Sequence, residues 1–285
     1  MKASTAAPLL VIVLIGALAP RTARSCELFG FSFNKPVRAN HLLVAFRRRS
    51  ENNPDGWGVA FYRNKAAQIF KEPGSAVESD LMDFLVGCRH IKPSLLIAHV
   101  RRATVGGVEY QNTHPFAREL NGREYVLAHN GTLVDFRKRL PLGRIQPLGV
   151  NDSEFLLCCI LGRIEEQKIT QWNEAGFEWL EKTLHEINEA GSINCLFSDG
   201  QYLFAYHDKN GAGTLHHVKR QAPFRTTRFP DIRKDIDLPS IYPPSVKGVL
   251  VATKPLTDEP WEAFKPGQLI VLRNGTPVFT GAPMR

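Results

Sequence analysis

The chain of 285 residues is 43% hydrophobic and 22% charged, an ordinary composition for a globular protein, which excludes disorder as its main state. Its formal charge is +8; Lys2, Arg21 and Arg24 in the first 25 residues supply three of these units, leaving +5 from Cys26 onward. The only dense basic cluster, Arg47–Arg49, is expected to be a solvated loop. The charge therefore gives no indication of a nucleic-acid partner.

The first 25 residues follow the plan of an export signal. A lysine follows Met1, an apolar core runs from residue 9 to residue 19, and small residues stand three and one before Cys26. This core is shorter than the about 20 residues needed to cross a bilayer. We expect cleavage before Cys26, export to the periplasm or the medium, and no stable membrane anchor after processing. An uncleaved anchor and a lipoprotein are the alternatives.

Four cysteines follow Cys26, at positions 88, 158, 159 and 195. In an exported protein they could form two disulfides in three different pairings. Cys158 and Cys159, however, lie inside the apolar run from Phe155 to Leu161. This favours buried, unbridged thiols that pack as small apolar side chains.

Short apolar segments separated by turn residues predict strands. These segments are Gly58 to Tyr62, Leu95 to Val100, Tyr125 to His129, Cys195 to Ser198, Tyr202 to Tyr206, Gly248 to Thr253 and Gln268 to Leu272. Two junctions, Asp199-Gly200 and Asn274-Gly275, are typical of hairpins because both residue types tolerate the positive φ of a type I′ turn. The strands should therefore pair antiparallel.

Three helices are expected, at Val77 to Cys88, Asp152 to Glu166 and Glu174 to Glu189. The second begins after Asn151 with Glu154 three residues on, in the manner of a capping box, and its apolar surface predicts a helix packed against a sheet. The stretch from Lys219 to Pro244 carries no periodicity and is expected to be a long surface loop. Hairpins mixed with helices indicate one layered α+β domain over residues 26–285.

Cleavage before Cys26 would give one residue both a thiol and a free α-amino group. The amine has a pKa of about 7.7 to 8.0 and a free thiol about 8.5, so the amine can accept the thiol proton near neutral pH. A cysteine in this position can act as a nucleophile without a histidine.

Six short motifs begin at this cysteine and recur along the chain. They are Cys26-Glu27-Leu28-Phe29-Gly30-Phe31-Ser32, Asp55-Gly56-Trp57-Gly58, His99-Val100-Arg101-Arg102-Ala103-Thr104, Asn112-Thr113-His114-Pro115-Phe116, His129-Asn130-Gly131-Thr132 and Asn151-Asp152-Ser153-Glu154. In order and spacing they resemble the class II glutamine amidotransferase family, and most closely its stand-alone members, which lack a synthase domain. The resemblance implies a four-layer αββα sandwich of the N-terminal-nucleophile (Ntn) hydrolase type, with two antiparallel sheets.

The resemblance also implies roles for individual residues. Arg101 corresponds to the arginine that holds the substrate α-carboxylate, a task suited to its planar guanidinium. Asp152 corresponds to the aspartate that receives the α-ammonium group. Asn130 and Gly131 correspond to the oxyanion hole, with the Asn side-chain amide and the Gly N–H as donors.

Three further residues have supporting parts in this interpretation. Thr104 and His114 would support and shape the substrate pocket, and Trp57 would pack in the core. Arg102 departs from the fused synthases, which usually carry Trp after the arginine, and this bears on which group beyond the γ-glutamyl unit is bound.

The sequence carries no Gly-x-Ser-x-Gly elbow, phosphate-binding loop, dinucleotide fingerprint or metal-ligand spacing, so no cofactor or metal is indicated. One rival is a papain-like enzyme in which Cys26 pairs with His99, His114 or His129. Another is an exported lipoprotein or γ-glutamyl binding protein without catalysis. The expected activity is hydrolysis of a γ-glutamyl amide, glutamine or a γ-glutamyl peptide such as glutathione; a subunit that passes ammonia to a separate partner is the alternative. Nothing in the sequence indicates an oligomeric state.

Overall fold

The computed structural model describes residues 26–283, so the predicted leader, residues 1–25, lies outside the described residues. The strands are β1 (Glu27–Phe33), β2 (Trp57–Arg63), β3 (Ala66–Glu72), β4 (Leu95–Val100), β5 (Phe116–Leu120), β6 (Arg123–Leu133), β7 (Gly191–Ser198), β8 (Leu203–Tyr206), β9 (His216–Gln221), β10 (Thr226–Phe229), β11 (Lys234–Asp237), β12 (Lys247–Ala252), β13 (Glu262–Ala263), β14 (Leu269–Arg273) and β15 (Thr276–Thr280). The helices are α1 (Asn40–Arg47), α2 (Asp80–Gly87), α3 (Phe136–Arg139), α4 (Asp152–Glu166), α5 (Glu174–Ile187) and α6 (Leu238–Ile241).

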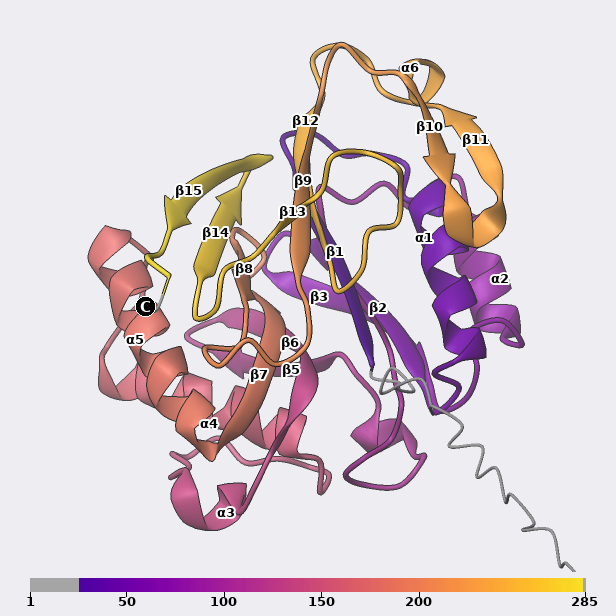
Figure 1. Cartoon of the computed structure of the whole chain (residues 1–285). Helices are drawn as coiled ribbons and strands as arrows, with labels where there is room; N and C mark the ends of the chain where they lie inside the picture. Colours follow the sequence, from indigo (N-terminus) through magenta and orange to yellow (C-terminus); the bar gives the residue numbers. More distant parts are fainter. Residues whose placement is uncertain (1–25, 284–285) are drawn as a thin grey trace, which may run out of the picture.

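Two antiparallel sheets lie face to face in the middle of the molecule (Figure 1). The first has the strand order β13-β9-β12-β1-β4-β2-β3, and the second the order β15-β14-β8-β7-β6-β5. Helices α1 and α2 cover the outer face of the first sheet, and α4 and α5 cover the outer face of the second. This is the four-layer α+β arrangement predicted from the sequence.

Three apolar clusters fill the spaces between the four layers. Leu28, Ile97 and Leu196 belong to the cluster between the sheets, while Phe46 and Leu184 belong to the two clusters beneath the helices. Both faces of each sheet are therefore covered, which is why the central strands β1 and β4 are buried at every residue. The continuous apolar run that predicted β4 follows from this double burial.

The seven strands and three helices predicted from the sequence are confirmed, with small shifts at their ends. Helix α2 begins at Asp80 rather than near residue 77, because the Ser79 hydroxyl caps it by accepting from the Met82 N–H at 3.0 Å. Helix α4 has the predicted bounds, and the Asn151 side chain caps it through the Ser153 N–H at 2.7 Å. Glu154 does not complete a capping box, because its carboxylate bonds Gly149 and Arg118 instead.

Both predicted hairpins form, but only one turn has the predicted geometry. Between β14 and β15, Asn274 and Gly275 both have positive φ, of 47° and 76°, as a type I′ turn requires. Between β7 and β8 only Gly200 has a positive φ, of 85°. The prediction for Asp199 is therefore wrong; its carboxylate instead accepts from the N–H groups of Gln201 and Tyr202 and closes a longer turn.

The prediction of a long surface loop over Lys219 to Pro244 is wrong. Strand β9 extends into this stretch, β10 and β11 form a separate two-stranded hairpin beside α1, and α6 follows (Figure 1). Phe229, Leu238 and Tyr242 from this stretch are buried in the cluster beneath α1. The strands were missed because each has four residues, too few for an alternating pattern to stand out among the Pro, Arg and Asp residues around it.

The cysteines are unbridged, as the apolar run predicted. Cys158, Cys159 and Cys195 are buried and free, and Cys26 and Cys88 are partly exposed and free. None of the helices between residues 26 and 283 has the length and apolar character that crossing a membrane requires.

Candidate active site

Cys26 lies directly before β1, at the edge where this strand meets the end of β4. Because Glu27 pairs with Val100, Cys26 falls beside the residues that follow β4. Its sulfur lies 3.2 Å from both the backbone nitrogen and the carbonyl oxygen of Arg102. Two of the predicted motifs, far apart in sequence, thus meet at this thiol.

Burial raises the pKa of the Cys26 thiol, while its bond to the Arg102 backbone and the positive charge of Arg101 act in the opposite direction. Since burial is the largest of these effects, the thiol keeps its proton near neutral pH. A thiol in this position needs a base in order to become a nucleophile.

Asn130 and Gly131 reach Cys26 from the other sheet. Both lie on β6, and the Asn130 side-chain amide donates to the Cys26 carbonyl oxygen at 2.5 Å. Gly131 passes so close to β7 that a Cβ built on it would lie 2.1 Å from the Ser192 carbonyl oxygen, so only glycine fits. The Asn-Gly pair is therefore part of a strand and not a turn, and its amide donor lies against the nucleophile.

Arg101, the first residue after β4, is 2% exposed and folds back along its own loop. Its guanidinium donates to the carbonyl oxygens of Val105, Gly106 and Gly107 at 2.8 to 3.1 Å. Within the described residues, no carboxylate forms an ion pair with it. Its charge nevertheless acts on the Cys26 thiol, whose pKa it lowers.

Asp152 is the first residue of α4 and is 3% exposed. One carboxylate oxygen accepts from the Leu133 N–H at 2.9 Å, so the helix start is tied to the end of β6. The negative charge of Asp152 raises the pKa of Cys26, opposite in direction to the effect of Arg101. Asp152 thus combines a structural contact with a charge that acts on the nucleophile.

The two residues expected to shape the pocket have different surroundings. Thr104 is exposed and lines a cavity that opens on Cys26. His114 is buried, lies in neither cavity at Cys26, and stacks on His99 with ring centroids 4.0 Å apart. Trp57 is fully buried in the cluster beneath α1 and α2, as predicted.

The three histidines of the papain-like alternative do not contact the thiol. His99 and His114 have no hydrogen-bond partner for either ring nitrogen within the described residues. His129 Nε2 lies 3.1 Å from the Ser192 carbonyl oxygen, which can only accept, so Nδ1 accepts from the Ser153 hydroxyl at 2.9 Å. Cys26 also precedes a strand rather than opening a helix. The papain-like interpretation therefore has no geometric support.

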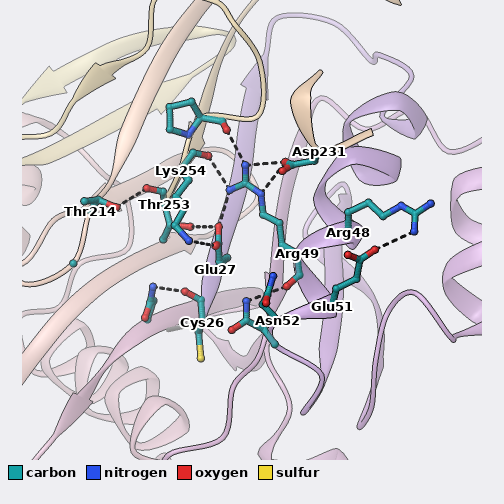
Figure 2. Close-up of a pocket in the computed structure, with 14 residues that line it drawn as sticks. Cys26, Glu27, Arg48, Arg49, Glu51, Asn52, Thr214, Asp231, Thr253 and Lys254 are labelled. Carbon is teal, nitrogen blue, oxygen red and sulfur yellow. Dashed lines mark hydrogen bonds and ion pairs between the residues drawn. The ribbon is translucent and has the colours of Figure 1, made fainter. Parts of the chain in front are cut away.

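A buried ionic cluster beside Cys26 was not predicted. Arg49 donates from all five N–H positions, to Glu27 at 2.6 Å, to Asp231 at 3.0 and 3.1 Å, and to the carbonyl oxygens of Lys254 and Pro255. Figure 2 shows these side chains gathered on one side of Cys26, with the sulfur directed away from them. The prediction that Arg47–Arg49 is a solvated loop is wrong, because the segment ends α1 and turns Arg49 inward.

Glu27 is the residue of this cluster that a signal in the sequence could have revealed. It is an acidic residue that directly follows Cys26 and begins a run of apolar strand residues, and it is 4% exposed. A carboxylate inside a buried strand requires a cation. Arg49, Lys254 and the Thr253 hydroxyl all donate to it.

Two cavities open on Cys26. The smaller, of about 210 Å³, is lined by Thr104, Gly131 and Ser192 among others, and the larger, of about 800 Å³, is bordered by the ionic cluster. Cys26 and Asn130 line both. Of the residues predicted for the site, four therefore line the smaller cavity: Cys26, Asn130, Gly131 and Thr104. Arg101 and Asp152 line neither cavity but act on Cys26 through their charges. His114 also lies outside both cavities, stacked on His99.

Comparison with known proteins places this geometry in a family. The model for the class-II glutamine amidotransferases matches residues 25–285. An uncharacterized protein of Methanocaldococcus jannaschii is 42% identical over 255 residues, which cover 90% of this chain and 71% of that protein. YafJ of Escherichia coli strain K12, whose name describes it as a candidate glutamine amidotransferase, is 36% identical over 85% of this chain and 95% of its own length.

A solved structure has the same architecture. The 2.0 Å crystal structure of a predicted glutamine amidotransferase from Pseudomonas aeruginosa PA01 matches with a TM-score of 0.68 at 29% identity, over 89% of this chain and 100% of that one. The two face-to-face antiparallel sheets with outer helices are the Ntn-hydrolase fold predicted from the motifs. The chain belongs to the class-II glutamine amidotransferase family.

Proposed function

We propose that the chain hydrolyses a γ-glutamyl amide, glutamine or a γ-glutamyl peptide, through the thiol of Cys26. Membership of the family supports hydrolysis or transfer of the glutamine amide as the general activity. The observation that carries the proposal is the position of Cys26, which lines both cavities and whose carbonyl oxygen accepts a hydrogen bond from the side-chain amide of Asn130.

The base in this mechanism is the α-amino group of Cys26. Because burial raises the pKa of the thiol, the sulfur does not ionise unaided, and no histidine in the described part of the chain contacts it. A free amine with a pKa of about 7.7 to 8.0 can accept the proton as the sulfur attacks the γ-carbonyl carbon. The same group then protonates the leaving nitrogen, and water hydrolyses the γ-glutamyl thioester.

The acyl part of the substrate occupies the smaller cavity. Asn130 and Gly131 line it and would donate to the carbonyl oxygen as it becomes negative, a contribution typically worth about 100- to 1,000-fold in rate per donor. Arg101 and Asp152 carry opposite charges that both act on Cys26, which suits the α-carboxylate and α-ammonium groups of a γ-glutamyl unit.

Processing is part of the proposal. The export signal inferred for residues 1–25 would place Cys26 at the start of the mature chain after cleavage, in the periplasm or the medium. Export separates the enzyme from a cytoplasmic synthase that would use ammonia, and this favours simple hydrolysis over transfer.

The test is to isolate the protein from an exporting host, sequence its N-terminus, and measure ammonia or amine release from glutamine and γ-glutamyl peptides. The mature chain should begin at Cys26 with a free amine, and Cys26→Ala should abolish hydrolysis. Brief reaction and acid quenching of the wild-type protein should trap the γ-glutamyl group on Cys26, detected by mass spectrometry.

Two results would end the proposal. One is a mature N-terminus at another residue or an acylated Cys26, because the thiol would then lack its base. The other is undiminished turnover by a folded Cys26→Ala variant.

A further inference from the structure

The larger cavity has no use in the cleavage of glutamine. The leaving group of glutamine is ammonia, which is about the size of a water molecule with its share of about 30 Å³. The cavity beside the ionic cluster measures about 800 Å³, within the range of sites that hold whole small-molecule ligands. Because Cys26 and Asn130 line both cavities, a substrate whose acyl group fills the smaller one would direct its leaving group into the larger.

The wall of this cavity is a built and rigid structure. Arg49 is 8% exposed, and all five of its N–H donors are used, so it holds the turn after α1, the β10–β11 region and the 254–255 segment together. Thr214 and Thr253 continue the wall through a hydrogen bond of 2.7 Å (Figure 2). A wall fixed in this way is preorganised for a ligand, because binding costs little additional conformational entropy of the protein.

The carboxylates of this wall are already neutralised. Glu27 is paired with Arg49 and Lys254, Asp231 with Arg49, and Glu51 with Arg48 at the rim. Within the described lining, no carboxylate is left to attract a positively charged leaving group.

Lys254 is a cation of the wall with donors to spare. The side chain of Lys254 is 66% exposed, and its ammonium group carries one recorded hydrogen bond, to Glu27 at 2.7 Å, out of three N–H donors. Lys254 follows β12 at the end that lies next to Cys26, and it lines the larger cavity. In the proposed mechanism the α-amino group of Cys26 becomes positively charged once it has accepted the thiol proton, and Cys26 lines the same cavity.

We propose that the larger cavity binds the leaving group of the substrate, and that this group is an amino acid or short peptide whose carboxylate is held by Lys254. The inference rests on the proposed function and narrows its substrate to γ-glutamyl amino acids and peptides. The Cys26 sulfur bonds to the γ-carbonyl carbon as the C–N bond breaks, and the leaving amine takes the proton that came from the thiol. Water then releases glutamate and returns a proton to the sulfur.

The experiment compares kcat/KM of the processed protein for glutamine, γ-glutamylglycine and γ-glutamylethylamide. The last two have leaving groups of similar size, but only glycine carries a carboxylate. The wild-type protein should prefer γ-glutamylglycine over both. In Lys254→Gln the preference for γ-glutamylglycine over γ-glutamylethylamide should fall about three- to tenfold, mainly through KM, as expected for one partly exposed charge-assisted contact. Lys247→Gln is the matched control, since Lys247 is an exposed lysine at the other end of β12; it should leave the preference unchanged.

The inference is overturned if glutamine is cleaved as efficiently as γ-glutamylglycine, or if Lys254→Gln lowers kcat/KM equally for γ-glutamylglycine and γ-glutamylethylamide. Failure of the underlying proposal is a different result, namely that none of the three compounds is hydrolysed in a manner that depends on Cys26.

Discussion

Two buried arginines lie near Cys26, and their partners differ: Arg49 bonds Glu27, the residue after Cys26, and Arg101 precedes Arg102, whose backbone contacts the sulfur. Arg49 donates to two carboxylates and two carbonyl oxygens, whereas Arg101 donates to carbonyl oxygens alone. Both have little exposed surface, 8% and 2% respectively. The same type of side chain is thus paired with carboxylates at position 49 and, within the described residues, has no ion-pair partner at position 101.

This difference indicates a structural role for Arg49 and suits a substrate-binding role for Arg101. A buried charge is tolerated when it is paired or hydrogen-bonded, and Arg49 is completely satisfied by the protein itself. Carbonyl oxygens accept the hydrogen bonds of Arg101, and the carboxylates of Asp55 and Asp152 act on its charge without forming an ion pair with it. In the proposed function Arg101 binds the substrate α-carboxylate. On that proposal, we expect loss of Arg49 to reduce stability first and loss of Arg101 to reduce substrate affinity first.

The largest expected effect is on stability. Replacing Arg49 with Met leaves Glu27 and Asp231 as partly or fully buried carboxylates without their main cation. Removing one partner of a buried pair typically costs about 3–5 kcal/mol in the free energy of unfolding, measured here by urea denaturation. Arg228→Met is the control, because the Arg228–Asp235 pair is exposed on both sides and should contribute less than about 1 kcal/mol. Equal effects of the two substitutions would show that the cluster is not a structural element.

The second effect is on catalysis. Arg101→Lys keeps the positive charge but loses the planar fork that binds a carboxylate through two parallel bonds. We expect KM for a γ-glutamyl substrate to rise about 10- to 100-fold with little change in kcat, the equivalent of about 1.5–3 kcal/mol for a charged hydrogen bond. Steady-state kinetics measure this split directly.

The control for Arg101 is Arg89→Lys, a change at an exposed residue that should alter neither constant. If Arg101→Lys instead lowered kcat at constant KM, the guanidinium would serve to shape the 105–107 loop, and its comparison with Arg49 as a ligand-binding group would fail.

A charge without a carboxylate partner should also act on its neighbours. Burial, and after it the charge of Arg101, lowers the pKa of His99 from 6.5 to about 3. Unfolded chains take up this proton near pH 6.5 and the folded protein only near pH 3, so stability falls as the pH is lowered through that window. The loss is at most about 1.4 kcal/mol per pH unit for this group.

The measurement is the free energy of unfolding at pH 7, 6 and 5 for the wild type and His99→Phe, which keeps a ring beside His114. The variant should show a slope smaller by about one proton. His90→Gln, at an exposed position, should retain the wild-type slope. An identical slope in His99→Phe would mean that His99 does not contribute to acid sensitivity.

Much of this fold could be predicted because local patterns agree with the final packing. The buried runs at β4 and β12 and the apolar helix α4 carry their burial in consecutive residues, so the signal is local. The β10–β11 hairpin could not be predicted, because its strands are short and its stability comes from Phe229 packing against distant residues.

The site divides in the same way. Cys26 and Asn130 could be predicted because the motifs that contain them are specific in residue type and order. In the structure the Asn130 side chain contacts Cys26. The role of Arg49 could not be predicted, because the sequence does not distinguish it from Arg47 and Arg48. Only the fold brings residues 27, 231 and 254 into contact with it. The chemistry of a residue can be predicted from its own motif, but burial depends on contacts far away in the sequence.

The smallest expected effect tests, on the adjacent residues Arg48 and Arg49, whether burial rather than residue type decides the strength of an ion pair. Arg48 and Arg49 have the same chemistry, but the Arg48–Glu51 pair is 49% and 54% exposed, so water screens it. A double-mutant cycle with Arg48→Gln and Glu51→Gln should give a coupling energy of about 0.3–0.5 kcal/mol, falling further in 1 M salt. The Arg49–Glu27 pair, analysed in the same way, should give a coupling several times larger and insensitive to salt. If the two couplings were equal, burial would not be what makes Arg49 structural, and the contrast with Arg101 would need another cause.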